Sequence, residues 1–161
     1  AWAYLQTGRE DDANNIMDEL VEGSTPRRPG DFDRSLLIRA LQARAQLYAL
    51  AFRYDEAIAD MDAAIRYDSR NPELYVLRGN ITLLIYEWDS VIADYNAAIE
   101  LDPDYANAYF YRAVFFYTRA DYPAALNDFT RYLELAPNGE HAAAATAYIE
   151  EINTTQDALD G

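Results

Sequence analysis

With 161 residues, 51% of them apolar and 25% charged, the chain has the composition of one globular domain with its own hydrophobic core. Its 28 acidic and 13 basic residues give a net charge of −15, which disfavours nucleic acid and anionic lipid surfaces as partners and favours basic ones. No apolar run is long enough to span a bilayer, and the absence of cysteine excludes disulfides and thiolate metal sites.

The first break in the chain is a loop over residues 23–33. This stretch reads GSTPRRPGDFD, and its glycines and prolines interrupt regular structure. The loop separates residues 1–22 from a long repetitive region over residues 34–139, which a final segment follows.

The repetitive region has a period of 34 residues. Aligned positions include Ala45, Gly79 and Ala113, then Tyr54, Trp88 and Tyr122, then Ile65, Ile99 and Leu133. Each unit divides into two stretches with apolar residues three and four positions apart, which is the spacing of amphipathic helices. We therefore predict three helix pairs. They run over residues 38–71, 72–105 and 106–139.

One more helix is predicted after the third pair. Residues 140–153, EHAAAATAYIEEIN, favour a helix by propensity. A solenoid exposes its last stacking face unless a terminal helix covers it, so this segment is expected to be a capping helix. Residues 154–161 are predicted to be a flexible tail.

These units resemble the tetratricopeptide repeat family, whose unit is a 34-residue helix–turn–helix. As in that family, the stretches NAAIELDP and RYLELAP close the second and third units on Pro103 and Pro137, whereas the first ends on Ser69. Tyr132 stands where the family has a small residue, which implies looser or rearranged packing against whatever follows the third repeat. The resemblance implies an all-α fold, a right-handed α-solenoid of helix–turn–helix repeats with a C-terminal capping helix.

The resemblance extends to residues 1–22. They match the end of the first helix and the whole second helix of an earlier repeat, so we expect a partial N-terminal repeat there. The chain then opens in the middle of a repeat, so either the first helix is stunted or the chain is a piece of a longer protein, and we favour the second.

An arginine and an aspartate recur at a spacing of sixteen positions in every unit. The pairs are Arg44 with Asp60, Arg78 with Asp94, and Arg112 with Asp128. In an antiparallel helix pair this separation can bring the two side chains together, within a repeat or across to the next. We predict a structural ladder of charge-assisted hydrogen bonds that fixes helix register, in preference to a catalytic or anion-binding arginine row.

The sequence contains no pattern typical of an enzyme. His141 is the only histidine, so neither a histidine-based metal site nor a Ser–His or Cys–His nucleophile can be assembled. The six glycines are scattered and form no phosphate-binding loop. We therefore predict no catalysis, no cofactor and no metal.

The family resemblance implies that the first helix of each repeat lines a concave groove that selects the partner. The corresponding positions in the first unit are largely polar, with Gln42 and Gln46 among them, and the face becomes apolar and aromatic toward the third unit. The predicted groove residues are Val76, Asn80, Leu83, Leu84, Phe110, Val114 and Tyr117. The lysines of the chaperone-binding subgroup are absent, so a chaperone clamp is not predicted.

Such a groove predicts a scaffold that binds a peptide or helix of a protein partner with apolar or basic character. The alternative is self-association, as a homo-oligomer or as an architectural module of a larger protein. The sequence indicates neither the partner nor the compartment.

Overall fold

The computed structural model describes residue 18 and residues 34–160, with side chains as far as Thr155. The predicted partial repeat over 1–22, apart from Asp18, and the predicted loop over 23–33 lie outside the described residues. The part of the chain that is described forms seven α-helices and one short 3-10 helix, without strands. They are α3 (Arg34–Leu50), α4 (Tyr54–Tyr67), α5 (Pro72–Thr82), η1 (Leu83–Ile85), α6 (Trp88–Leu101), α7 (Ala106–Thr118), α8 (Tyr122–Leu135) and α9 (Ala142–Asp160).

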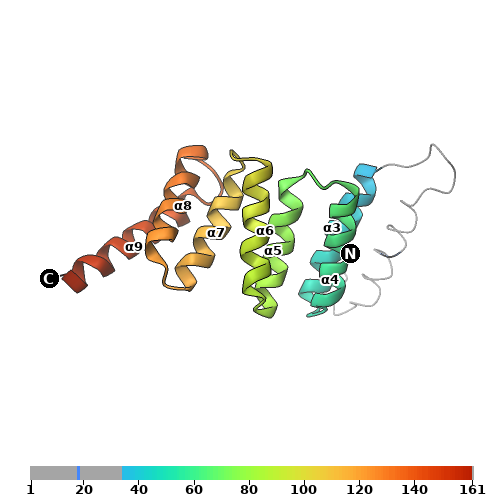
Figure 1. Cartoon of the computed structure of the whole chain (residues 1–161), viewed down its shortest axis with the longest axis horizontal. Helices are drawn as coiled ribbons and strands as arrows, with labels where there is room; N and C mark the ends of the chain where they lie inside the picture. Colours follow the sequence, from blue (N-terminus) through green and yellow to red (C-terminus); the bar gives the residue numbers. More distant parts are fainter. Residues whose placement is uncertain (1–17, 19–33, 161) are drawn as a thin grey trace.

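The helices stand side by side in one row, each packed mainly on its neighbours in sequence (Figure 1). Three antiparallel pairs follow one another, α3 with α4, α5 with α6, and α7 with α8, and α9 packs on the last pair. The predicted all-α repeat solenoid is therefore confirmed. None of the described helices combines the length and apolarity that crossing a bilayer requires.

The hydrophobic core runs along the row as three clusters. The first is centred on Leu37, Met61 and Leu74, the second on Val91 and Tyr95, and the third on Phe129 and Ile152 with their neighbours. Each cluster joins one helix pair to the next helix, so packing is local at every point of the chain. Stability is accordingly distributed over the row, and no single centre holds the fold together.

Local signals start two of the helices, α5 and α8. Asn71 caps α5 by accepting a hydrogen bond from the Glu73 amide at 3.1 Å, and Pro72 occupies the first turn. Asp121 caps α8 in the same way by accepting from the Ala124 amide at 3.3 Å. These short-range bonds satisfy amides that have no partner inside the helix.

The turn inside each helix pair contains one residue in the left-handed region. These residues are Phe52 (φ 60°), Tyr86 (φ 64°) and Ala120 (φ 58°), which follow the repeat period of the sequence. All three turns lie along the same edge of the row, the lower edge in Figure 1. The connections between pairs lie along the upper edge.

The C-terminal helix is longer than predicted. α9 continues to Asp160, so residues 154–160 are helical and not the flexible tail that we expected beyond residue 153. The hydroxyls of Thr154 and Thr155 donate to the carbonyls of Glu150 and Glu151, both at 2.8 Å. No glycine or proline interrupts the segment before Gly161, so the helix propagates.

Tyr132 shows the rearranged packing that its size implies. Its side chain is buried against α9, and its hydroxyl accepts a hydrogen bond from the His141 amide at 2.9 Å. Gly139 makes room for the phenol, because a Cβ built there would lie 2.4 Å from the Tyr132 hydroxyl. The large residue therefore anchors the turn that leads into α9.

Candidate functional site

The structure brings each predicted arginine onto its predicted aspartate. In the second repeat, Nε and Nη2 of Arg78 donate to the two carboxylate oxygens of Asp94 at 3.0 and 2.5 Å. Arg44 grips Asp60 in the same way at 2.7 and 2.6 Å, and Arg112 grips Asp128 at 2.6 and 2.9 Å. These are bidentate, charge-assisted pairs, the geometry in which arginine holds a carboxylate most specifically.

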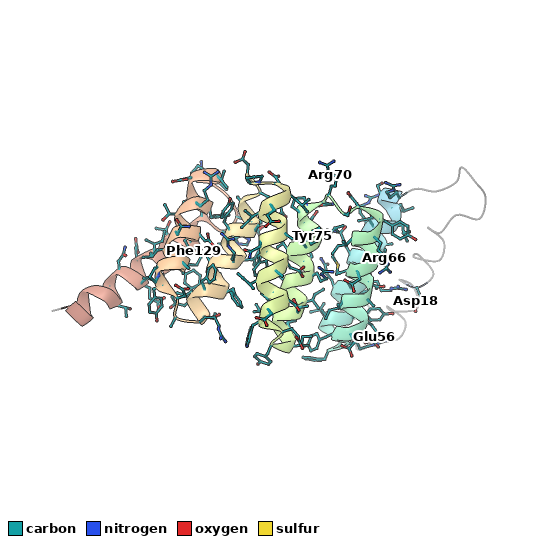
Figure 2. The ribbon with its side chains drawn as sticks, viewed as in Figure 1. Asp18, Glu56, Arg66, Arg70, Tyr75 and Phe129 are labelled. Carbon is teal, nitrogen blue, oxygen red and sulfur yellow. The ribbon has the colours of Figure 1, made fainter. Side chains whose placement is uncertain are left out.

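Each arginine makes a third hydrogen bond, which ties Arg78 and Arg112 to the preceding repeat. Nη1 of Arg78 donates to Asp62 at 2.6 Å, and Nη1 of Arg112 donates to the neutral Asn96 at 2.7 Å. Nη1 of Arg44 reaches Asp18 at 2.6 Å, and Figure 2 shows Asp18 beside the α3–α4 pair. Asp62 and Asn96 were not among the predicted ladder residues, although each stands sixteen positions before its arginine.

The acidic partners of the ladder are buried. The carboxylates Asp60, Asp94 and Asp128 are among the buried polar residues of the described chain. Burial raises the pKa of Asp94, and the hydrogen bond and charge of Arg78 act against that rise. The same hydrogen bonds raise the pKa of Arg78, so the guanidinium stays charged. Three donors of Arg78 are bonded to the carboxylates of Asp94 and Asp62, an arrangement that favours a role in helix register over ligand binding.

Two of the predicted groove residues are not available to a partner. Val76 is 2% exposed and Phe110 is 7% exposed. Val76 packs with Val91 and Tyr95 between α5 and α6. Phe110 stacks on His141 with ring centroids 4.1 Å apart and an interplanar angle of 9°. We therefore correct the prediction for both, because neighbouring helices and the turn before α9 cover the face on which they lie.

The other predicted residues of the third repeat pack on the core cluster that includes α9. Tyr117 packs on Tyr148 with ring centroids 4.8 Å apart, and its hydrogen bond with Glu151 raises its pKa to about 12. Val114 is half-buried against the same cluster. The aromatic end of the predicted groove is thus occupied by the chain's own C-terminal helix.

An open groove lies instead between α3 and α5. It is a pocket of about 450 Å³. Its lining residues are Gln42, Ala43, Gln46, Leu47, Ala49, Leu50, Met61, Leu77, Asn80, Ile81 and Leu84. We call this set the α3–α5 pocket. Two leucines at its rim are strongly exposed, Leu50 at 57% and Leu84 at 50%.

The α3–α5 pocket contains only part of the predicted groove. Asn80 and Leu84 line it, whereas Leu83 is half-buried against the core cluster that contains Val91 and Tyr95. The apolar floor was missed, with Leu47, Leu77 and Ile81, because polar Gln42 and Gln46 made the first repeat look hydrophilic. The available signal in the sequence was the recurrence of leucine one repeat apart, at positions 50 and 84.

Metal chemistry finds no support among the described residues, where no cluster of three or more histidine, cysteine or acidic side chains could hold an ion. The pocket walls carry amides and aliphatic groups and no nucleophile paired with a base. The arrangement can bind apolar groups and orient them with amide hydrogen bonds.

Comparisons with known proteins agree with this architecture. A family model described as tetratricopeptide repeat matches residues 38–71, which coincide with the first predicted repeat. A search of curated proteins found no match to the sequence.

Solved structures similar to the chain share the repeat fold. The first tetratricopeptide repeat domain of Spaghetti (RPAP3), bound to the HSP90 peptide SRMEEVD, has a TM-score of 0.67 and 26% identity over 74% of this chain and 95% of that chain. The translocator chaperone SycD of Yersinia enterocolitica, as an alternative dimer, has a TM-score of 0.68 and 15% identity over 74% and 93%. MamA has a TM-score of 0.63 and 14% identity over 98% and 95%. Residues 38–71 thus match the tetratricopeptide repeat family, and the repeating helix pairs of the described chain share the fold of these solved structures.

Proposed function

We propose that the chain is a non-catalytic scaffold for protein–protein interaction that binds an apolar peptide or helix of a partner in the α3–α5 pocket. The observation that carries the proposal is the exposure of Leu50 and Leu84 at the rim of an open, aliphatic pocket of about 450 Å³. Apolar surface gathered around a hollow is typical of binding sites and uncommon elsewhere on soluble proteins. The similar domain of Spaghetti (RPAP3) holds a peptide, which supports a peptide-binding role here.

The size of the pocket sets the expected affinity. A volume of about 450 Å³ accommodates two or three apolar side chains, and each contributes about 1.5–3 kcal/mol when well buried. Ordering the bound segment offsets part of this gain, which leaves a dissociation constant on the order of micromolar. The amides of Gln42 and Gln46 supply hydrogen bonds along one wall.

Self-association is the second candidate. SycD, which is similar in fold, was crystallised as a dimer. A pocket with leucines at its rim is a surface that a second copy could also cover. Sedimentation at rising protein concentration separates the two candidates, because self-association increases the mean mass and a monomeric scaffold leaves it constant.

A designed peptide tests the proposal. The probe is a fluorescent amphipathic helix of about 18 residues with leucines on one face and serine and glutamine elsewhere. We expect fluorescence anisotropy to show micromolar binding, weakened about tenfold or more by the double substitution Leu50→Asn, Leu84→Asn.

The matched control is Leu101→Asn. It removes another exposed leucine, 38% exposed, which is the last residue of α6 and does not line the pocket. Circular dichroism checks that all variants keep their helices. Equal binding by the pocket variant and the wild type would contradict the proposal.

A further inference from the structure

Two aromatic side chains continue the exposed apolar surface beyond the α3–α5 pocket. Phe52 is 79% exposed and Tyr86 is 72% exposed. Each follows a rim leucine by two positions, Phe52 after Leu50 and Tyr86 after Leu84. Both lie in the turns at the same edge of the row (Figure 1). We call Phe52 and Tyr86 the turn aromatics.

The fold does not require aromatic residues at these positions. Both residues adopt the left-handed backbone region, φ 60° for Phe52 and 64° for Tyr86, which glycine adopts most easily and bulky side chains rarely do. In the equivalent turn Ala120 makes the same conformation with a methyl group. Within the described part of the chain, the turn aromatics meet the rings of Tyr54 at 6.2 Å and Trp88 at 5.2 Å, edge to face. Such edge contacts do not account for two large, mostly exposed rings on an unfavourable backbone.

The charges along this edge are mainly negative. The two turns that hold the turn aromatics, with the first turns of α4 and α6 that follow them, carry the exposed carboxylates of Asp55, Glu56, Glu87 and Asp89. Two arginines lie among them, and both are engaged. Arg53 pairs with Glu56 at 2.9 Å and lies over the Tyr48 ring, and Arg119 lies over the Trp88 ring at 5.2 Å.

From these observations we propose that the turn aromatics and the neighbouring acidic side chains extend the α3–α5 pocket into a docking surface for a basic segment of another protein. This inference rests on the proposed function and adds the chemistry of the partner. Apolar residues of that segment fill the pocket and pack on Phe52 and Tyr86, while its lysines or arginines face the carboxylates. Charge complementarity argues against a second copy as the occupant, because two chains with a net charge of −15 repel each other.

The test uses three peptides with the same leucine face and different flanks, carrying lysine, serine or glutamate. At low salt we expect the lysine peptide to bind about tenfold more tightly than the serine peptide, and the glutamate peptide more weakly than either. The advantage of lysine should shrink at about 0.5 M salt, because exposed charges are then screened.

Variants then locate the surface. The double variant Phe52→Gly, Tyr86→Gly, called the glycine variant, should weaken binding of the lysine peptide about tenfold or more. Its melting temperature should be unchanged or higher. Ala120→Gly, the same backbone change without loss of a ring, should bind normally. The double variant Glu87→Gln, Asp89→Asn should reduce the advantage of the lysine peptide over the serine peptide. The control double variant Glu100→Gln, Glu150→Gln changes the net charge equally but elsewhere, and it should leave that advantage unchanged.

The outcomes separate this inference from the proposed function. If the serine peptide binds as tightly as the lysine peptide, or if the glycine variant binds normally, the inference is overturned and the pocket proposal stands. If none of the three peptides binds, both are wrong. A dimer in sedimentation that dissociates in the glycine variant would also overturn the inference, with a second copy as the occupant.

Discussion

Replacing Arg78 with alanine removes three hydrogen bonds, two within its own repeat and one to the preceding repeat. The guanidinium holds Asp94 within its own repeat and Asp62 in the preceding one. The side chain of Asp94 is 6% exposed and that of Arg78 is 26% exposed, so the variant leaves a buried carboxylate without its cation. Breaking one side of a buried pair costs about 3 kcal/mol or more, and we expect a loss at the lower end of that range because Arg78 is partly solvated.

Such a loss is measurable in two ways. Urea denaturation should show a lower midpoint with an unchanged slope, and about 3 kcal/mol corresponds to a fall of roughly 6–12 °C in melting temperature for a chain of this size. Arg70→Ala is the control, since Arg70 points away from the helices in Figure 2. Exposed substitutions of that kind change stability by about 0.5 kcal/mol or less.

The pH dependence gives a second, independent readout. Burial raises the pKa of Asp94 and Arg78 opposes that rise, so the pKa should rise further in the variant. A carboxyl whose pKa is higher in the folded than in the unfolded state contributes most to the free energy of unfolding at a pH below its unfolded pKa. This contribution is lost as the pH rises through the folded pKa. The deficit of Arg78→Ala should therefore be largest near neutral pH and shrink toward about pH 4.5. An unchanged melting temperature, or a deficit that is the same at both pH values, would refute the argument.

Three further substitutions test the packing. Gly79→Ala should destabilise by about 1–3 kcal/mol in urea denaturation, because the added Cβ would lie 2.8 Å from the fully buried Tyr95 ring; wild-type stability would contradict so close an approach of α5 to that ring. Ala120→Gly should stabilise by about 1 kcal/mol, because φ 58° is unfavourable for alanine, and a lower urea midpoint would count against that reasoning. Ile152→Ala should cost about 2–5 kcal/mol, because Ile152 is 1% exposed; a near-neutral effect in thermal unfolding would mean that α9 is not part of the core.

Much of the candidate site was predictable where it depended on spacing alone. The ladder pairs Arg44–Asp60, Arg78–Asp94 and Arg112–Asp128 follow from their sixteen-residue separation, since helix length and a short turn determine which residues of an antiparallel pair face each other. Leu84 and Asn80 were found because their repeat positions lie on the first helix.

The predicted apolar part of the groove lies at the end of the row on which α9 packs. Phe110 and Tyr117 have the residue types of a binding surface, and the repeat pattern puts them on the inner face. His141 and Tyr148, which cover them, belong to a segment that follows the repeats. Whether an aromatic ring binds a partner or packs in the core depends on what lies over it.

The amino-acid order decided the period, the helix pairs and the charge ladder, because each of these follows from contacts between residues close in sequence or one repeat apart. The folded arrangement alone decided which part of the inner face is open. Burial depends on neighbours from elsewhere in the chain, and α9 fills the aromatic end while the α3–α5 pocket remains accessible. The backbone conformation of Phe52 and Tyr86 likewise emerged only in three dimensions, since no local residue preference favours a bulky side chain at positive φ.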